Sequence, residues 1–332
     1  MGTLERIVAG TILAMSVGCK AEQDIRDTGS ETEYCNTEEG KDSVLCGHQV
    51  KRASSSDGIY WSYDNIVLID EASVPAPDIL EEQEELSDGT VLDPGTIILY
   101  YVDGSVGPNE CIALAYSTDN ADYFTTVGCI EIEGEPTANV DPATSFRDHQ
   151  RFLYYFAGDP QYEDPAMTLG VHDIMVATCP YIDSCKEVEI PVFSLEGVAD
   201  PDVFSNGDLY ILKLALTTKY GRTIVTTSQN GMEFDGENYE EFPYYEYGLS
   251  KPFQLEDGQY VMPAFNQLAS ASEGEISNFR SDNGIDWRIG EQNILEVPSK
   301  KIITDTQVVQ LLDGSYIMIF KEADWTEPTD EG

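Results

Sequence analysis

Short apolar runs recur along the chain, and turn residues rich in Gly, Asp, Asn and Ser separate them. Residues 112–116 (Ile-Ala-Leu-Ala-Tyr) and 223–227 (Thr-Ile-Val-Thr-Thr) have the length and composition of β-strands. Each of these runs leads into one phrase: Ser, any residue, Asp or Asn, usually Gly, and an aromatic residue six positions after the Ser. The copies of this turn phrase start at Ser55, Ser117, Ser228 and Ser281. Their recurrence at blade-sized intervals predicts stacked β-sheets.

The turn phrase has the chemistry of a tight β-hairpin. Asp or Asn beside Gly tolerates the positive φ that such a turn needs, and the Ser and Asp side chains accept hydrogen bonds from turn amides. The aromatic residue is expected to pack beneath the turn. A fifth copy is expected where Cys179 stands at the Ser position and Cys185 at the aromatic position, so that a disulfide replaces the aromatic contact.

A second phrase predicts the inner strands of the sheets. It consists of a short residue pair, often Asp-Pro, then an apolar strand, a Gly-containing turn and another apolar strand. Its copies begin at Ala76, Asp141, Asp200, Lys251 and Asp305. Two strands from this phrase and two from the hairpin make four antiparallel strands in each sheet. The sequence therefore predicts an all-β fold, a five-bladed β-propeller.

The order of the two phrases predicts how the ring closes. The second phrase at Asp305 runs towards the C-terminus without a hairpin copy of its own, whereas the hairpin at Ser55 precedes every copy of the second phrase. We therefore expect the N-terminal strands to complete the last blade. Such closure removes the open sheet edges that invite aggregation.

Composition narrows the classes of function. The chain has 332 residues, 61 acidic against 18 basic residues, a formal charge of -43 and 41% hydrophobic residues, which is enough to bury a sizeable core. This charge repels phosphate backbones, so nucleic-acid binding is excluded. The acidity is typical of solubility in salty surroundings, with a structural calcium ion as the alternative.

Motifs for other cofactors do not occur. The sequence has no nucleophile elbow, phosphate-binding loop or dinucleotide fingerprint, which argues against serine hydrolase and nucleotide chemistry. The chain has three His, and their spacing does not favour a zinc site. No cofactor is expected beyond the calcium.

The N-terminus has the features of an export signal over residues 1–19. Arg6 precedes an apolar run over 7–17, and the stretch 16–19 resembles the lipobox of bacterial lipoproteins, in which Cys19 would be acylated. Ser16 stands where that motif prefers Leu, which leaves ordinary secretion as the second choice. We expect an outer-membrane or cell-surface lipoprotein, or alternatively a secreted or periplasmic protein.

Four segments follow from these patterns. They are the signal over 1–19, an acidic tether over 20–45, the propeller over 46–325 and a tail over 326–332. We expect a monomer that contacts the membrane only through its lipid.

The six cysteines other than Cys19 suit an oxidising compartment. Pairing of nearest neighbours is favoured, although other pairings are formally open. The favoured pairs are Cys35 with Cys46, Cys111 with Cys129, and Cys179 with Cys185.

The whole pattern resembles the five-bladed propellers of glycoside hydrolase families 43 and 32 over roughly residues 46–320. The most specific element of this resemblance is Ala-Asp-Pro-Asp-Val-Phe at 199–204, followed by Gly-Asp-Leu-Tyr-Ile-Leu at 207–212. The turn phrases resemble the Asp-boxes of sialidases. Sialidases have six blades and an arginine triad, and Arg52, Arg222 and Arg280 lie at unequal offsets from their boxes, so sialidase is the weaker fit.

The resemblance implies a sugar-binding funnel where the inner strands begin. The catalytic candidates it implies are Asp141, Asp200 and Asp305, and the substrate-binding candidates are Lys251 and, in a shifted first blade, Asp78. Tyr244 and Tyr245 belong to an aromatic loop ahead of blade 4 and are expected to offer a flat platform for sugar stacking. In this alignment Ala76 occupies the position of the catalytic base and Ala199 that of the acid, so both expected groups are missing. Asp78 as base, with Glu196, Glu273 or Glu275 as acid, would restore the pair. Asp before Pro also initiates turns, which is the structural alternative.

Two functions follow from this interpretation. The first is a glycan-active propeller, related to glycoside hydrolases, that binds a carbohydrate ligand in its funnel or cleaves it. The second is a non-catalytic interaction module. An open funnel with two carboxylates at hydrolytic separation favours the enzyme, and a plugged axis favours the module.

Overall fold

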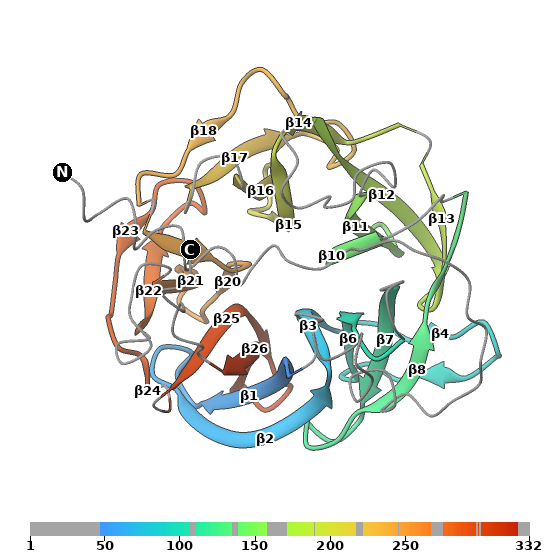
Figure 1. The fold of residues 1–332 in the computed structure, drawn as a ribbon, viewed down its shortest axis with the longest axis horizontal. Coiled ribbons are helices and arrows are strands. Elements are labelled where there is room, and N and C mark those ends of the chain that lie inside the picture. The colour runs from blue at the N-terminus through green and yellow to red at the C-terminus, as the bar shows by residue number, and fades with distance from the viewer. Residues whose placement is uncertain are drawn as a thin grey trace, which may run out of the picture.

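The protein is a five-bladed β-propeller, as predicted (Figure 1). A computed structural model describes residues 47–106, 111–134, 139–157, 171–188, 190–216, 222–244, 246–266, 275–296, 298 and 300–324. Every regular element in these ranges is a β-strand. The export signal with Cys19, the tether, the C-terminal tail and the Cys35–Cys46 pair lie outside the described residues.

The first three blades are built from strands that follow one another in the sequence from the axis outwards. Blade 1 contains β3 (Ala72–Ile79), β6 (Ile97–Asp103), β7 (Cys111–Ser117) and β8 (Thr125–Cys129). Blade 2 contains β10 (Asn139–Arg147), β11 (Gln150–Ala157), β12 (Val171–Tyr181), β13 (Ser184–Glu187) and β14 (Phe193–Glu196), which pairs with β12. Blade 3 contains β15 (Val198–Ser205), β16 (Tyr210–Leu216), β17 (Arg222–Ser228) and β18 (Glu240–Glu241).

The last two blades differ from this order. In blade 4 the inner and outer strands are each interrupted, and blade 5 combines strands from both ends of the chain. In blade 4, β19 (Tyr247–Leu249) and β20 (Phe253–Gln254) both pair with β21 (Tyr260–Asn266), and β22 (Glu275–Ser281) pairs with β23 (Arg288–Ile289) and β24 (Leu295–Glu296). Blade 5 contains β25 (Lys301–Gln310), β26 (Tyr316–Asp324), β1 (Gln49–Ser55) and β2 (Ser62–Asp70).

Two short additions connect blades 1 and 2. The hairpin of β4 (Glu84–Glu85) and β5 (Val91–Leu92) is inserted between β3 and β6. The strand β9 (Glu131–Glu133) follows blade 1 and pairs in parallel with β13 at the outer edge of blade 2. Blade 2 is therefore wider than the predicted four antiparallel strands.

The N-terminal strands complete the last blade, which confirms the predicted closure. β1 lies between β26 and β2, with Gln49 opposite Glu322 and Ser55 opposite Tyr316. Inside this sheet Lys51 Nζ lies 2.8 Å from Glu322 Oε1, and both side chains are almost fully buried. The Tyr63 hydroxyl of β2 also donates to Glu322. One buried carboxylate thus joins three strands from opposite ends of the chain.

The turn phrases share the expected hydrogen bonds. Ser55 Oγ accepts from the Gly58 amide at 2.9 Å, and the Asp57 carboxylate accepts from the next two amides at 2.8 and 3.0 Å. The turns at Ser228 and Ser281 repeat this pattern with Asn in place of Asp. In each of these three turns the Asp or Asn at the third position of the turn phrase therefore fixes the backbone by accepting hydrogen bonds from its amides.

The copy at Ser117 is one residue longer than the other three. Its Oγ accepts from Ala121, and both Asn120 and Ala121 have positive φ, at 61° and 62°. Tyr123, which was expected to pack beneath the turn, is therefore 70% exposed, and Phe124 is buried in its place at 4%. The prediction for Tyr123 was wrong because the Gly-less turn needs an additional residue.

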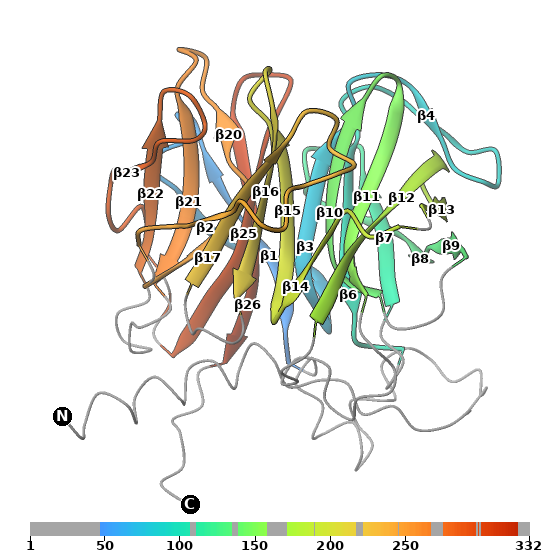
Figure 2. The ribbon, with the colours of Figure 1, turned by 90° about the horizontal axis from the view of Figure 1, so that it is seen from above.

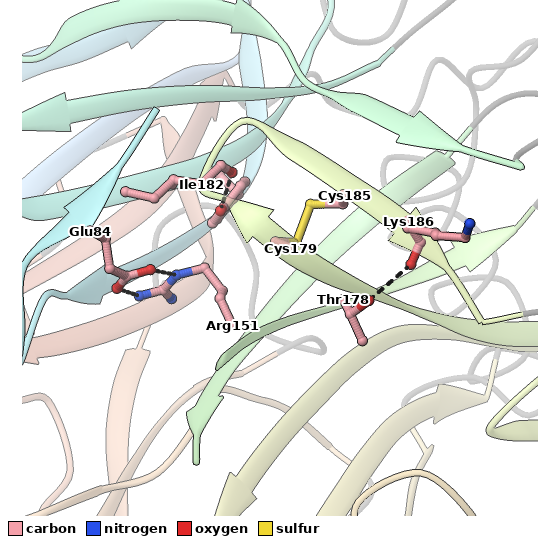
Figure 3. The surroundings of a disulfide bond; sticks show 8 residues. Glu84, Arg151, Thr178, Cys179, Ile182, Cys185 and Lys186 are labelled. Atoms are coloured by element: carbon pink, nitrogen blue, oxygen red, sulfur yellow. Dashed lines mark hydrogen bonds and ion pairs between the residues drawn. A yellow bond between two sulfur atoms is a disulfide. The ribbon is translucent and has the colours of Figure 1, made fainter. Parts of the chain in front are cut away.

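Two of the predicted disulfides lie within the described residues, and both are confirmed. Cys111 pairs with Cys129, with an S–S distance of 2.05 Å, and Cys179 pairs with Cys185 at 2.08 Å. Figure 3 shows the second bond joining β12 to β13. It occupies the place of the aromatic contact in blade 2, as the fifth copy of the turn phrase predicted.

The core lies between adjacent blades. Because side chains alternate along a strand, β6 faces blade 5 on one side and blade 2 on the other. Leu99 lies in the same buried cluster as Ile319 of β26, whereas Tyr100 lies in the cluster that contains Tyr155 of β11. Every residue of β6 is buried, and all but the last, Asp103, are aliphatic or aromatic, so the strand packs on both faces.

We expect Glu322→Gln to lower the free energy of unfolding by about 3 kcal/mol, because it leaves the Lys51 ammonium buried beside a neutral amide. Urea denaturation followed by tryptophan fluorescence measures this change. Arg288→Gln, which removes an exposed ion pair with Asp282, serves as the control and should cost no more than about 0.5 kcal/mol. Equal effects of the two substitutions would show that closure does not depend on this carboxylate.

Candidate functional site

A β-bulge marks the start of the inner strand in four blades. In each, two residues of the inner strand face one residue of its neighbour, as between Val140 and Ala143 in β10. The first bulged residue has positive φ in every case. These residues are Val74 (45°), Asp141 (57°), Asp200 (50°) and Asp305 (51°).

The bulges define which positions of the blades are equivalent. They make Val74 equivalent to Asp141, whereas Ala76 lies two residues further along β3. The sequence Val-Pro-Ala-Pro offers two residue-Pro pairs at 74–77, and only the bulge distinguishes them. The alignment of Ala76 with Asp141 was therefore wrong, and Val74 is the residue of blade 1 that corresponds to Asp141. Both Ala76 and Val74 are apolar, so blade 1 lacks a carboxyl group at this position in both alignments.

The three aspartates predicted from the second phrase meet at the axis, although they come from three different blades. The side chains of Asp141 and Asp200 lie within hydrogen-bonding reach of each other. Asp305 Oδ2 lies 2.6 Å from the Nζ of Lys321, a residue of β26. Asp200 is exposed, and Asp141 and Asp305 are half-buried. All three lie near the start of the inner strands, which run side by side around the axis (Figures 1 and 2).

Crowding of these carboxyl groups favours their protonated forms. Enclosure between the blades raises the pKa of Asp141 to about 6, and the charge of Asp305 adds to this shift. The surrounding blades also displace water from the Asp200 carboxyl group, although part of this residue reaches solvent at the end of the axis, and this loss of water and the charges of Asp141 and Asp305 raise its pKa well above the usual range. Lys321 opposes both shifts. Near neutral pH the Asp141–Asp200 pair therefore holds a proton, which a hydrogen bond between the two carboxyl groups requires.

His48 lies beside this group, just before β1. Its burial, with the charge of Lys321, lowers the pKa of the imidazole to about 3, so the ring is neutral. Its Nδ1 atom is buried and has no hydrogen-bond partner among the described residues. Lys321 is therefore the cation that faces the three carboxylates.

A second layer of polar side chains crosses the axis below the aspartates. Lys213 Nζ lies 3.0 Å from Asp202 Oδ2, and Gln307 donates to the other oxygen of Asp202 at 3.0 Å. Lys213 also donates to the backbone of Ser250. Blades 3 and 5 are not adjacent, so the contact between Asp202 and Gln307 spans the axis. Buried, mutually bonded groups thus close the axis beneath the exposed Asp200.

Asp78 and Lys251 lie in a third layer, away from the aspartate triad. Lys251 Nζ donates to the Thr144 carbonyl at 2.9 Å, and Asp78 pairs with Arg151 at 2.7 Å. Burial opposes ionisation of Asp78, but the charges of Arg151 and Lys251 outweigh it and lower its pKa. Arg151 is also bidentate to Glu84 of β4 (Figure 3). The structure places these two predicted residues in an ion-pair network instead of beside Asp200.

The predicted aromatic platform has a packing partner. The ring of Tyr244 lies 4.9 Å from that of Phe279 and 5.6 Å from that of Phe242. Tyr245 and Glu273 lie outside the described residues. Glu196 is exposed at the end of β14. Glu275 lies in β22, where its backbone is opposite that of Glu296 in β24.

The described ranges lack the usual features of a metal site and of a membrane span. They contain no group of three or more His, Cys, Asp or Glu arranged to hold a metal ion, and the structural calcium stays a prediction. Nor does any helix in the same ranges have the length and apolarity to cross a bilayer.

Several solved structures that share this architecture are glycoside hydrolases. An α-L-arabinofuranosidase from Clostridium thermocellum aligns with a TM-score of 0.55 and 14% identity, over 74% of this chain and 80% of that one. A thermostable family 43 glycoside hydrolase gives 0.53 and 13%, over 77% and 90%. The GH43_1 enzyme from Xanthomonas citri complexed with xylose gives 0.52 and 11%, over 84% and 91%.

The likeness shows a shared fold. It confirms the five-bladed architecture that the resemblance to family 43 predicted. No family model and no curated protein matches the sequence. The chemistry of the funnel must therefore be argued from the residues of this chain.

The raised pKa of Asp141 predicts a pH-dependent stability. A carboxyl group whose pKa is higher in the folded state stabilises that state below about pH 4, and this contribution is lost as the pH rises through about 6. Compared with the wild type, Asp141→Asn should therefore gain stability between pH 4 and pH 8, on the order of 1 kcal/mol after solvent screening.

Urea unfolding at a series of pH values tests this expectation. Asp208→Asn carries the same change of charge in the exposed turn between β15 and β16, at the opposite end of β15 from Asp200. Its difference from the wild type should not change with pH. A flat difference for Asp141→Asn as well would contradict the proposed protonation.

Proposed function

We propose that the protein binds a saccharide in its axial funnel, through the carboxyl groups of Asp141, Asp200 and Asp305. The observation that carries this proposal is the meeting of three carboxyl groups from three blades at one end of the axis, with Asp200 exposed. The structure of this fold that was determined with xylose supports the ligand class.

The charge state of the Asp141–Asp200 pair suits sugar hydroxyl groups. A protonated carboxyl group donates a hydrogen bond, and an ionised carboxylate accepts one, so the pair offers both functions to a ligand whose hydroxyl groups also do both. The layer around Asp202 and Lys213 closes the axis beneath the pair. A ligand therefore binds at the mouth and does not pass through the ring. A closed axis is also the feature expected of a non-catalytic module, so it counts against hydrolysis.

Binding is favoured over hydrolysis by two features of the site. Glycoside hydrolysis by two carboxyl groups needs a separation of about 5 to 9.5 Å, which leaves room for the sugar carbon or a water. The side chains of Asp141 and Asp200 lie within hydrogen-bonding reach of each other, which is closer than this separation. Blade 1 contributes Val74 at its bulge, where the other three bulges carry Asp.

One observation favours hydrolysis as the second candidate. The pKa of Asp200 is raised, whereas Asp305 is ion-paired to Lys321. Two carboxyl groups in such contrasting environments are the usual arrangement of a general acid and a charged partner. In that case Asp200 would protonate the leaving oxygen and Asp305 would activate water.

Calorimetric titration with xylose, xylotriose and arabino-oligosaccharides tests the proposal. Asp200→Ala should weaken binding about tenfold or more, because it removes a hydrogen bond to a carboxyl group. Asp208→Ala at the far end of β15 is the control and should bind as the wild type does. The proposal fails if the wild type binds none of these saccharides, or if Asp200→Ala binds equally well.

Incubation with aryl arabinofuranosides and aryl xylosides separates the two candidates. A binding protein releases no aryl alcohol above the level of the Asp200→Ala variant. Release that depends on Asp200 would instead establish the hydrolase.

We also propose that the protein is exported and tethered through acylated Cys19. The support is the Arg6-led apolar segment and the lipobox-like stretch at 16–19. Cys19→Ala should move the expressed protein from the detergent-extracted membrane fraction to the aqueous fraction, as followed by immunoblotting. Cys19→Ala protein that stays in the membrane fraction would contradict lipid anchoring.

A further inference from the structure

Lys321 is a buried cation at the mouth of the funnel that the sequence patterns did not single out. It lies in β26, the second strand of blade 5, opposite Thr304 of β25 and Val50 of β1. Its side chain is 11% exposed, and its Nζ lies 2.6 Å from Asp305 Oδ2. The next residue, Glu322, pairs with Lys51 and Lys301. Because consecutive side chains of a strand point to opposite faces, the Lys321–Asp305 pair and the group around Glu322 lie on opposite faces of β26.

Four ionisable groups face the Lys321 ammonium. They are Asp305 on β25, Asp200 on β15, Asp141 on β10 and His48 before β1. Burial opposes the charge of Lys321, but the three carboxyl groups outweigh it and raise the pKa of the ammonium. His48 is neutral, and the charge of Lys213 in the layer below also acts on Asp200.

One of these carboxyl groups differs from the other two in its contact with Lys321. Asp305 Oδ2 lies 2.6 Å from Lys321 Nζ, whereas Asp141 and Asp200 occupy equivalent bulges of adjacent blades, within hydrogen-bonding reach of each other. A carboxyl–carboxyl hydrogen bond requires a proton, and an ion pair requires its absence.

We propose that Lys321 is a positioning residue of the funnel, which holds Asp305 as a charged partner and confines the proton of the site to the Asp141–Asp200 pair. This inference rests on the proposed function for its role in sugar binding, because that pair is the one offered to the ligand. Lys321 itself is held by Asp305 and acts on the ligand through the neighbouring carboxyl groups. Its removal changes the charge of the pair rather than a contact with the sugar.

The proposal predicts shifts of opposite sign for two variants. Lys321 opposes the raised pKa of Asp141 and Asp200, and Asp305 contributes to it. Lys321→Met should therefore raise the titration midpoints of the pair by about one pH unit, and Asp305→Asn should lower them by a similar amount. Lys321→Arg keeps the charge and should restore the midpoints of the wild type.

Carbon-13 NMR of the aspartate carboxyl carbons measures these midpoints in the ligand-free protein, with assignment by Asp141→Asn and Asp200→Asn. Midpoints near or above pH 6 stand apart from ordinary aspartates, which titrate near pH 4. A purely structural role for Lys321 predicts no difference in sign between the two variants. Unchanged or lowered midpoints in Lys321→Met would overturn the proposal.

A second comparison applies where Lys321→Met fails to fold. The double variant Lys321→Met/Asp305→Asn removes both members of the ion pair and leaves no unpaired buried charge. Its midpoints should lie above those of Asp305→Asn alone, since the two proteins differ only in the lysine. Equal midpoints in these two proteins would also overturn the proposal.

Titration with xylotriose at several pH values connects the inference to binding. The pH at which affinity changes should move upwards in Lys321→Met with the NMR midpoints, and Lys321→Arg should keep the profile of the wild type. If the wild type binds no saccharide, the proposed function fails while the NMR comparison still decides the role of Lys321. An affinity profile that stays fixed while the midpoints move would overturn the role of Lys321 in binding.

Discussion

The closure of the ring by β1 is the constraint on which the rest of the structure depends. This strand lies between β26 and β2, so segments from both ends of the chain form one sheet. A closed ring of five sheets directs every inner strand to one axis. Residues from blades that are not neighbours then touch, as Lys251 of blade 4 does with Thr144 of blade 2. The polar layers on the axis exist because these contacts cross it.

The carboxylates of the inner strands come close together at the axis, and nearby cations are needed to offset their repulsion. The chain has few cations. It holds 18 basic against 61 acidic residues, yet each axial layer contains at least one buried or half-buried cation. They are Lys321 in the first layer, Lys213 in the second, and Arg151 with Lys251 in the third. A buried carboxylate without a partner costs several kcal/mol, so this allocation of charge is a condition of folding. The first layer differs because its own lysine, Lys321, faces three carboxyl groups, and Lys213 of the second layer also acts on one of them, Asp200.

The sequence predicted those features that repeat within one blade. The blade number, the disulfide between Cys179 and Cys185 and the closure by N-terminal strands all follow from the order of local phrases. Features that depend on three-dimensional register were missed. The equivalence of Val74 and Asp141 rests on a bulge, and Lys321 is one of three charged residues that follow the apolar part of β26. Neither carries a local pattern, because bulges and axial contacts are fixed by partners distant in sequence.

Val74 also shows whether the bulge itself requires an aspartate at this position. Asp before Pro initiates turns, and a positive φ is easier for Asp than for most residues, so Asp141, Asp200 and Asp305 have a structural explanation. Val74 adopts the same conformation at the equivalent position, with φ of 45° and Pro75 after it. The backbone of the bulge therefore does not require a carboxyl group. Three of them are placed where they repel one another, which lowers stability without any need of the fold. Such local cost is typical of sites kept for binding or chemistry.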